Sequence, residues 1–321
     1  MTFAGSPDRA EARLVPAAGF ELHTFRISGI HRKPGAAMAR SLLLALRAPA
    51  ACARIIERRR PDVVLGGGGY VAGPMVYSAW RHHIPAALTE ADAHLGLANR
   101  LAAPFARRVF LAYPIAGRTG SKYRVVGRPV PLVERVTREE GRRRFGLPQE
   151  APVLLVFGGS QGAQAVNEAA VEAFGASGPA VLHLCGERYV ADLRPRVSRP
   201  DYVLLPWTDD LAAALAACDL VFARAGGSIW EVAAAGRPAV LVPSPNVTAD
   251  HQTKNAHHFE QGGGAVVVPE QEISRAAEVV RSLLGDDRRR AQMAEAMLAL
   301  ARPDAADVIA EELISLARAG R

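Results

Sequence analysis

The segment FGGSQGAQAVNEAA, residues 157–170, has the residue types and spacing of a phosphate-binding loop. It directly follows the apolar pentapeptide VLLVF at 153–157, and helix-forming residues continue to 174. A buried strand, a glycine turn and a helix in this order aim free backbone N–H groups and the positive end of the helix dipole at an anion. The segment therefore predicts an anion site, although on its own it would also suit a tight turn that needs small residues.

Two other segments carry groups that suit a ligand. The glycine run at 66–69 follows a second apolar segment, DVVLG at 62–66, and so repeats the pattern of strand and glycines. Glu231 follows the segment RAGGS, where we expect the first turn of a helix. A carboxylate there can accept ligand hydroxyl groups, or it can be a surface residue that the helix dipole favours.

The sequence predicts no bound metal and no other cofactor. We expect Asp209 to cap a helix and Asp210 to lie in its first turn, which gives this acidic pair a structural role. The three cysteines, at 52, 185 and 218, lie in apolar segments without the spacing of metal ligands. Free cysteines of this kind indicate a reducing compartment.

Strand-like and helix-like segments alternate along the chain, which favours parallel sheets covered by helices. The expected strands are 62–66, 84–90, 107–113 and 122–127, then 153–157, 180–186, 202–207, 220–226 and 239–243. The charged stretch at 133–148 interrupts the pattern. We therefore predict an α/β protein with two doubly wound, Rossmann-like domains, 1–135 and 136–321, that face each other across a cleft. Because ligands bind beyond the carboxyl ends of parallel strands, both glycine loops are expected to open on that cleft.

Basic residues are concentrated in the first half of the chain. The net charge is +12 over 1–135 and −5 over 136–321. This asymmetry suggests an anionic partner for the first half. The basic segments lack interleaved aromatic residues, so nucleic acid is a poor candidate. A phosphorylated substrate or an anionic membrane surface fits better.

The segment 36–56 is predicted to be an amphipathic helix that Pro49 kinks or interrupts. Its leucines and regularly spaced arginines suit either an ordinary surface helix or one that also contacts a membrane interface. No apolar run approaches the roughly 20 residues of a membrane span. The first residues also lack the pattern of a signal peptide. We therefore expect a cytoplasmic protein.

Six segments, taken in order, resemble the MurG family. They are LGGGGYVAGP (65–74), TEADAHLGLANR (89–100), FGGSQGAQAVNEA (157–169), PWTDDLAAAL (206–215), RAGGSIWEVAAAGRPAVLVP (224–243) and TADHQTKNA (248–256). The resemblance implies a two-domain GT-B fold and a role in peptidoglycan synthesis, and hence in cell-wall biogenesis, cell shape and cell division. It implies an inverting glycosyltransferase, peripheral to the cytoplasmic face of the plasma membrane. This enzyme would move N-acetylglucosamine from UDP-N-acetylglucosamine to a muramyl-pentapeptide polyprenyl pyrophosphate, converting lipid I to lipid II.

The resemblance assigns the donor to the second domain. The 158–162 loop would face the leaving diphosphate, Glu231 would accept the ribose hydroxyls, and the backbone around Thr208 would read the uracil edge. Gln252 and Asn255 would hold the sugar hydroxyls. The donor-binding residues that it implies are Gly159, Ser160, Gln161, Gly162, Asn167, Thr208, Gly227, Ser228, Glu231, Gln252 and Asn255.

The resemblance assigns the acceptor and the membrane contact to the first domain. The acceptor-binding residues would be Gly68, Gly69, Tyr70 and Asn99, and the membrane-facing residues Leu43, Leu46 and Trp80. The segment TEAD at 89–92 matches a family segment usually written HEQN, and Glu90 retains the glutamate of that segment. We predict Glu90 as the general base and Asp92 as the second catalytic candidate.

The chain departs from the family pattern in three places. MurG proteins begin with a strand and a GGTGGH-like loop, whereas this sequence opens at what should be the second strand. We therefore expect a sheet that lacks one strand, and a chain that binds the donor but transfers sugar slowly. Thr89 and Asp92 differ from the family segment and favour an alternative, a GT-B transferase for another lipid or small-molecule acceptor. A non-catalytic protein that binds a nucleotide sugar also remains open. Arg128 stands where relatives have asparagine, and its role is not predicted.

Overall fold

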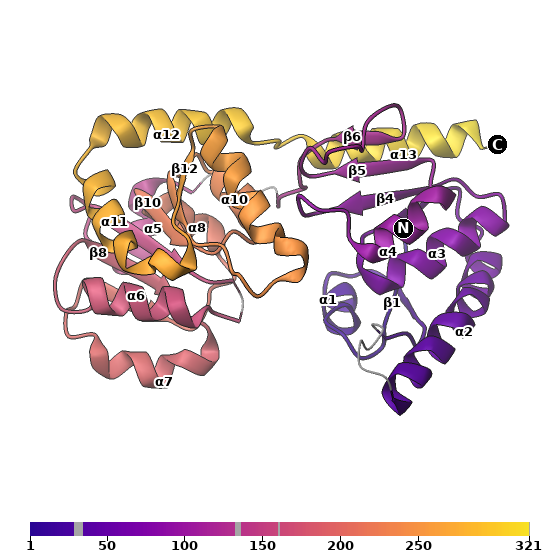
Figure 1. The fold of residues 1–321 in the computed structure, drawn as a ribbon, viewed down its shortest axis with the longest axis horizontal. Coiled ribbons are helices and arrows are strands. Elements are labelled where there is room, and N and C mark those ends of the chain that lie inside the picture. Colours follow the sequence, from indigo (N-terminus) through magenta and orange to yellow (C-terminus); the bar gives the residue numbers. More distant parts are fainter. Residues whose placement is uncertain (29–34, 132–135, 160, 321) are drawn as a thin grey trace. The chain divides into compact units, whose positions relative to one another are not determined.

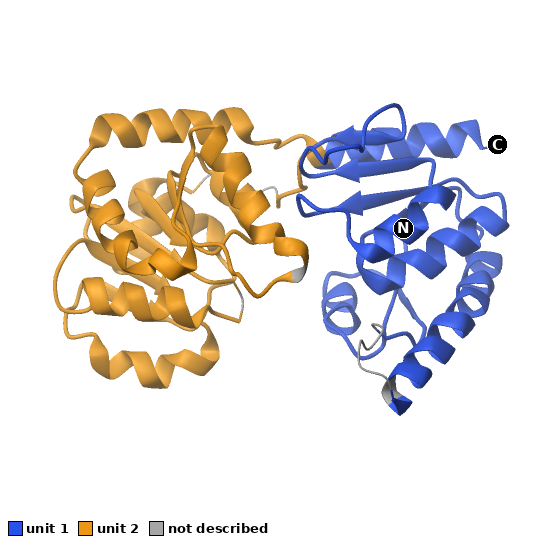
Figure 2. Cartoon of the chain, viewed as in Figure 1, with its two compact units in different colours: residues 1–126, 306–321 blue, residues 127–305 orange. Residues whose placement is uncertain are grey.

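The computed structural model describes residues 1–28, 35–131, 136–159 and 161–320, and divides the chain into two compact units (Figure 2). Unit 1 consists of residues 1–126 and 306–321, and unit 2 of residues 127–305. The predicted domains, 1–135 and 136–321, differ from these units in two respects. The chain passes into unit 2 already at Gly127, and the last helix belongs to unit 1.

A parallel sheet in the order β3-β4-β5-β6 forms the middle layer of unit 1 (Figure 1). Its strands are β3 (Val64–Gly66), β4 (Ala86–Glu90), β5 (Arg108–Leu111) and β6 (Tyr123–Val125). Side chains alternate between the two faces of the sheet. Leu88 and Val109 join the buried side chains of α2 (Ala36–Arg59), α3 (Gly69–Arg81) and α4 (Leu97–Ala102). The neighbouring residues Ala87 and Phe110 instead pack with α13 (Ala305–Ala319).

The start of the chain forms a small sheet of its own. Strands β1 (Phe3–Gly5) and β2 (Leu22–Thr24) pair in parallel, with α1 (Glu11–Ala17) between them in the sequence. Among the described residues, neither strand pairs with the four-stranded sheet. The opening strand, which we expected to be the second strand of that sheet, is thus separate from it.

Helix α2 runs unbroken through Pro49, so of the two expected effects, a kink or an interruption, the interruption is wrong. Proline lacks an N–H group and leaves one carbonyl of the preceding turn without its helical partner. The helix is held on both sides of this position, because Ala48 and Cys52 are buried against α3. In addition, the Ser78 hydroxyl of α3 donates a 2.9 Å hydrogen bond to the Pro49 carbonyl. Tertiary packing therefore outweighs the local effect of the proline.

The last helix, α13, is tied to unit 1 by charge and by apolar packing. The Glu312 carboxylate forms ion pairs with Arg108 of β5, at 3.3 Å, and with Arg124 of β6. Ile309 and Leu316 pack on the sheet face that carries Ala87 and Phe110. The residues that make these contacts are about 200 positions apart in the sequence. Local sequence patterns therefore do not reveal the contacts.

Unit 2 is built on a parallel sheet in the order β12-β11-β10-β7-β8-β9. Its strands are β7 (Val153–Phe157), β8 (Ala180–Leu184), β9 (Tyr202–Leu205), β10 (Leu220–Ala223), β11 (Ala239–Leu241) and β12 (Ala265–Val267). All five residues of β7 are buried, as a continuous apolar run in a central parallel strand predicts.

The helices of unit 2 cover this sheet (Figure 1). They are α5 (Arg138–Arg144), α6 (Gln164–Phe174), α7 (Val190–Leu193), α8 (Leu211–Ala217), α9 (Ile229–Ala234), α10 (His251–Gln261), α11 (Ala276–Leu284) and α12 (Asp287–Leu300). Short 3-10 turns also occur: η1 (Ala103–Phe105) in unit 1, and η2 (Glu187–Tyr189), η3 (Arg194–Arg196), η4 (Thr248–Asp250) and η5 (Glu270–Arg275) in unit 2. Phe174 of α6 and Val280 of α11 pack with Val156 on one face. The prediction of two parallel-sheet α/β domains is confirmed.

Candidate substrate-binding sites

The strand order of unit 2 reverses between β7 and β10. From β7 the chain builds β8 and β9 on one side, then returns to place β10 against the other side of β7. Ala223 at the end of β10 pairs with Phe157 at the end of β7, so the loops 158–163 and 224–228 leave the sheet side by side. Doubly wound sheets bind ligands at such a reversal.

The loop after β7 has the geometry of an anion site. Gly159 and Gly162 have φ angles of +85° and +70°, which residues with a side chain rarely adopt. The N–H of Gly162 donates a 2.9 Å hydrogen bond to the Gly159 carbonyl and closes the turn. Helix α6 then begins at Gln164 without a side-chain cap, so its first N–H groups suit a phosphate. Gln161 is exposed on this loop, and Ser160 lies outside the described residues.

Asn167 lies behind the loop and is buried, so its side chain supports the loop. Its Nδ2 donates a 2.8 Å hydrogen bond to the Cys185 carbonyl, and its Oδ1 lies 3.0 Å from Nε2 of His183. The Cys185 carbonyl in turn packs so closely on Gly162 that a β-carbon there would not fit. Of the predicted donor-binding residues, Asn167 is thus placed to act through the loop backbone.

The buried series of hydrogen bonds through Asn167 and His183 continues to β9. Nδ1 of His183 lies 2.8 Å from the Tyr202 hydroxyl, and burial lowers the pKa of His183 to about 3. Because the Asn167 amide nitrogen is engaged by Cys185, its oxygen faces His183, whose Nε2 must carry the proton. Neutral His183 then accepts at Nδ1 from the Tyr202 hydroxyl. One tautomer of His183 therefore satisfies every hydrogen bond in this series, from Tyr202 of β9 to the loop.

Glu231 lies in the first turn of α9, as predicted. It is half-buried, and this burial raises the pKa of its carboxyl, while the positive charge of Arg128 opposes the rise. Arg128 lies against the loop that carries Gly227 and Ser228, because a β-carbon on Gly227 would collide with its guanidinium. The Glu231 carboxylate of α9 and the Arg128 guanidinium therefore both lie close to the loop after β10.

The acidic pair before α8 is structural, but we predicted the wrong cap. The Asp210 carboxylate accepts a 3.0 Å hydrogen bond from the N–H of Ala213, so Asp210 is the N-cap and Asp209 lies outside the helix. The Thr208 hydroxyl accepts from the N–H of Asp210 and fixes the preceding turn. The cap moves by one residue because the helix begins one residue later than we expected. The described residues contain no group of His, Cys, Asp and Glu that could hold a metal ion.

Gln252 and Asn255 project from α10 toward two loops of this sheet edge. Oε1 of Gln252 accepts a 2.9 Å hydrogen bond from the N–H of Ser244, which follows β11. Nδ2 of Asn255 donates a 3.3 Å hydrogen bond to the Ala225 carbonyl, which follows β10, and this side chain is fully buried. Both residues therefore brace the loops at the edge where Glu231 lies.

In unit 1, the glycine run opens α3 at the end of β3. Gly68 and Gly69 have φ angles of +90° and +66°, and α3 begins without a side-chain cap. Tyr70 follows in the first turn and packs partly against the core. A β-carbon on Gly68 would lie 3.9 Å from Nδ2 of Asn99. The four predicted acceptor-binding residues therefore lie at one sheet edge.

Glu90, at the end of β4, holds the segment that follows it. Its carboxylate accepts 2.9 Å hydrogen bonds from the N–H of Gly96 and from Nδ2 of Asn99, and a 3.3 Å bond from the N–H of Asp92. Nδ2 of Asn99 also donates to the Thr89 carbonyl. Oδ1 of Asn99 is buried and has no hydrogen-bond partner in the described parts of the chain. The geometry thus gives Glu90 a positioning role that we did not predict.

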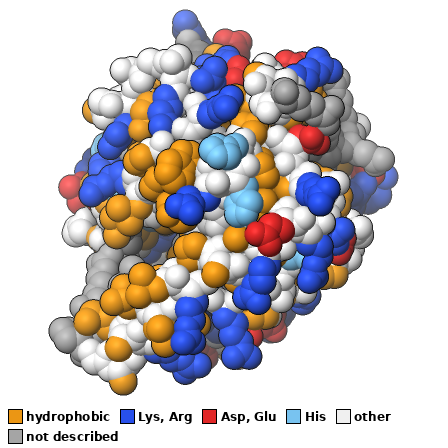
Figure 3. Space-filling view, turned by 90° about the vertical axis from the view of Figure 1, so that its right-hand side faces the viewer, with side chains coloured by type: hydrophobic (Ala, Val, Ile, Leu, Met, Phe, Trp, Pro, Cys, Tyr) orange, Lys and Arg blue, Asp and Glu red, His pale blue; other side chains and the backbone are white. Residues whose placement is uncertain are grey.

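Exposed apolar side chains lie on three consecutive helices of unit 1. Leu43 and Leu46 of α2 and Trp80 of α3 are exposed, with Leu46 at 72%. Leu97 and Leu101 of α4 are also exposed, a feature that sequence analysis missed because a six-residue helix shows no clear periodicity. Figure 3 shows hydrophobic side chains interspersed with basic ones and histidines on this side of unit 1. None of the described helices is long and apolar enough to cross a membrane.

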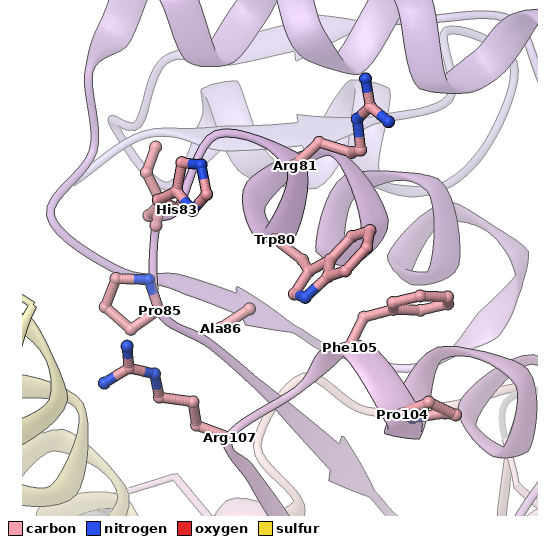
Figure 4. A pocket seen from close by; sticks show the side chains of 9 residues that line it. Trp80, Arg81, His83, Pro85, Ala86, Pro104, Phe105 and Arg107 are labelled. Atoms are coloured by element: carbon pink, nitrogen blue, oxygen red, sulfur yellow. The ribbon is translucent and has the colours of Figure 1, made fainter.

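A pocket of about 690 Å³ lies beside Trp80 (Figure 4). It is at the amino ends of β4 and β5, opposite the edge that carries Glu90. The Trp80 and Phe105 rings, with centroids 5.0 Å apart, lie on one side, and His83 and Arg107 on the other. The pocket therefore combines an aromatic wall with basic side chains.

Comparisons with known proteins agree with this architecture. The sequence matches the Glycosyltransferase family 28 N-terminal domain over residues 2–111 and the Glycosyltransferase family 28 C-terminal domain over residues 153–309. A curated relative from Salinibacter ruber is 41% identical over 99% of this chain and 88% of its own length. Another, from Rubrobacter xylanophilus, is 39% identical over 100% of this chain and 96% of its own. Both carry the name UDP-N-acetylglucosamine--N-acetylmuramyl-(pentapeptide) pyrophosphoryl-undecaprenol N-acetylglucosamine transferase.

Solved structures show the same fold. The crystal structure of Acinetobacter baumannii MurG superposes with a TM-score of 0.79 and 26% identity, over 98% of this chain and 90% of that one. A glycosyltransferase of kitacinnamycin superposes with a TM-score of 0.69 and 20% identity, over 97% of this chain and 91% of that one. At this identity the second likeness concerns the fold alone.

Proposed function

This chain belongs to the MurG family of glycosyltransferases, and from that membership we propose that it transfers N-acetylglucosamine from UDP-N-acetylglucosamine to the muramyl-pentapeptide pyrophosphoryl-undecaprenol acceptor of peptidoglycan synthesis. The names of the relatives state both the sugar and the acceptor, and their similarity extends over nearly the full chain.

The observation that carries this proposal is a phosphate-binding geometry in each unit. The acceptor and the donor each contain a pyrophosphate. Helix α3 in unit 1 begins at Gly69 and helix α6 in unit 2 begins two residues after Gly162; both lack a side-chain cap, and both glycines have positive φ. Each can therefore bind one of the two pyrophosphates.

In unit 2, we assign the donor to the edge where β7 and β10 end. The diphosphate would lie on Gly159, Ser160, Gln161 and Gly162, with Asn167 supporting them from behind. Glu231 would accept the ribose hydroxyls beside Gly227 and Ser228, and the backbone at Thr208 would read uracil. Gln252 and Asn255 would orient the sugar while they brace their loops.

In unit 1, we assign the acceptor pyrophosphate to Gly68, Gly69 and Tyr70. The unsatisfied Oδ1 of Asn99 would accept a hydrogen bond from the acceptor beside them. During transfer the acceptor oxygen bonds to the anomeric carbon, and the bond from that carbon to the β-phosphate oxygen breaks with its electron pair. The proton of the acceptor hydroxyl needs a base, for which we propose Glu90, with Asp92 as the second candidate.

We also propose that unit 1 attaches peripherally to the cytoplasmic face of the plasma membrane, where a polyprenyl-linked acceptor resides. Leu43, Leu46 and Trp80, together with Leu97 and Leu101, would enter the membrane interface. Arginines of the first half would add attraction to anionic lipids, at about 1 kcal/mol each near the surface.

Radiolabelled UDP-N-acetylglucosamine tests the proposed reaction. Incubation of the chain with this donor and a lipid I analogue should move the label into the lipid-soluble fraction and release one UDP for each sugar transferred. UDP release without labelled lipid would indicate donor hydrolysis and would count against the proposed transfer. Glu278→Ala, at an exposed position of α11, is a control that should transfer normally.

A further inference from the structure

We propose that Arg128 binds the diphosphate of the nucleotide sugar and stabilises UDP as the leaving group. This inference rests on the proposed function, because it needs a donor in unit 2. It adds to that site a side chain for which the sequence predicts no role.

Two glycines shape the place that Arg128 occupies. Gly127 has a φ of +82°, and a β-carbon on it would lie 3.5 Å from the Trp230 ring of α9 and would collide with Arg302. The backbone at 127 is therefore held close to α9. From there the Arg128 side chain reaches Gly227, where a β-carbon would collide with the guanidinium. Only glycine at 227 leaves the guanidinium this place beside the loop.

Among the described residues, no neighbouring group pairs with the charge of Arg128. The residue is half-buried, and no hydrogen bond or ion pair engages its side chain in the described part of unit 2. Arg224, in the same loop, shows the contrast: it pairs with Glu270 and donates to the carbonyls of Val242 and Pro243, at 3.1 and 3.2 Å. Arg224 thus has a structural role, whereas the Arg128 guanidinium is open to a ligand.

Arg128 lies at the edge where a nucleoside diphosphate would bind. The loop that it contacts leaves the sheet beside the 158–163 loop, because Ala223 and Phe157 are paired. Glu231 lies four residues after Gly227 and is near enough to feel the charge of Arg128 without forming an ion pair with it. A ligand with both a diol and a diphosphate satisfies this arrangement: the diol donates to Glu231, and the phosphate oxygens accept from Arg128.

The chemistry of transfer favours a guanidinium at this position. When the bond between the anomeric carbon and the β-phosphate oxygen breaks, its electron pair remains on the diphosphate. A fixed guanidinium donates two N–H bonds to phosphate oxygens, and it binds the additional charge more strongly than it binds the ground state. Arg128 should therefore contribute both to donor affinity and to kcat.

Calorimetry with UDP and with uridine separates this role from a structural one. The full chain is compared with Arg128→Ala, Arg128→Lys and the control Arg288→Ala, whose residue is exposed on α12. We expect Arg128→Ala to weaken UDP binding about tenfold or more, the loss of a charge-assisted hydrogen bond, and to change uridine binding less than about twofold. Arg128→Lys should lie between the wild type and Arg128→Ala, and Arg288→Ala should match the wild type.

Equal losses for UDP and uridine would overturn the inference, since Arg128 would then act only by shaping the loop at Glu231. Unchanged UDP binding would overturn it as well, while leaving the donor site of unit 2 in place. If the wild-type chain binds neither UDP nor uridine, the proposed function fails first and the inference with it. Should Arg128→Ala not fold, Arg128→Lys gives the same test: reduced UDP affinity and kcat with unchanged uridine affinity support the role, and unchanged values refute it.

Discussion

The side-chain amide of Asn99 donates one 2.9 Å hydrogen bond to the Glu90 carboxylate and another to the Thr89 carbonyl. Through this pairing, the end of β4 and the first turns of α4 hold each other in place. The carboxylate that we propose as the base is therefore also the anchor of the segment 91–96, and mutations at the two positions should have different consequences.

Glu90→Gln removes the base, and we expect kcat to fall by about 10² to 10⁴, the usual contribution of a positioned base. The affinity for UDP should not change, because we assign the donor contacts to unit 2. Asn99→Ala keeps the carboxylate but loosens the segment, so it should mainly raise the KM for the acceptor. Steady-state kinetics with varied acceptor measures both effects. If the two variants lose kcat equally, Glu90 acts only as an anchor.

Glu231→Ala should weaken UDP-N-acetylglucosamine binding by about 1–3 kcal/mol, because it leaves the ribose hydroxyls without their acceptor. Calorimetry measures this change, with Glu278→Ala as the exposed control. Unchanged affinity would reject the assignment of Glu231 to the ribose.

Substitution of the same carboxyl group should weaken donor binding but stabilise the folded chain at neutral pH. Burial raises the pKa of Glu231 above its ordinary 4.5 in the folded chain. Its contribution to stability is thus complete at pH values below 4.5 and is lost as the pH rises through the raised pKa. Glu231→Gln, which cannot ionise, should therefore melt at a higher temperature than the wild type at pH 7 but not at pH 4. Thermal unfolding at both pH values checks this, and a lower melting temperature at pH 7 would contradict it.

His183 predicts a loss of stability in acid. Its pKa is 6.5 in an exposed chain and about 3 in the folded one, so the unfolded chain takes up the proton first as the pH falls. The stabilising contribution is complete above pH 6.5 and is lost toward pH 3. Between pH 6.5 and 5 we expect this residue to lower the free energy of unfolding by roughly 1–2 kcal/mol. Urea unfolding at both pH values should show this loss in the wild type and in the exposed control His257→Gln, but not in His183→Gln. An equal loss in His183→Gln would contradict the assignment.

If α2 contacts the membrane, an exposed leucine of α2 should matter more for binding than an exposed isoleucine of α13. Leu46→Ser should weaken binding to phosphatidylglycerol vesicles about tenfold, in line with about 1.5 kcal/mol for a leucine transferred from water. Ile314→Ser changes a residue of α13, on the opposite face of the sheet, and should have no effect. Added salt should weaken the binding of the wild type and of both variants to the vesicles. Vesicle sedimentation in which the two variants bind equally would argue against α2 as the contact.

The strands and the glycine loops could be predicted from the sequence because their signals are local. VLLVF at 153–157 is strand β7 at its predicted bounds, and each other expected strand is present but shorter at one or both ends. Strands β2 and β12, of three residues each, were not predicted.

Contacts between distant segments could not be predicted. The pairing of Glu312 with Arg108 places α13 in unit 1, although this helix follows unit 2 in the sequence. For the same reason, the motif that contains Asn167 indicates a donor loop but not that this side chain faces inward to His183. Motifs locate the loops, and tertiary packing decides which of their side chains reach a ligand.

A comparison of two acceptors tests whether the chain transfers sugar to the proposed acceptor. Initial rates of sugar transfer from UDP-N-acetylglucosamine are measured with a lipid I analogue and with diacylglycerol at equal concentrations, using the full chain. We expect transfer to the lipid I analogue with inversion at the anomeric carbon, and little or none to diacylglycerol. Faster transfer to diacylglycerol, or donor binding without transfer to the lipid I analogue, would contradict it.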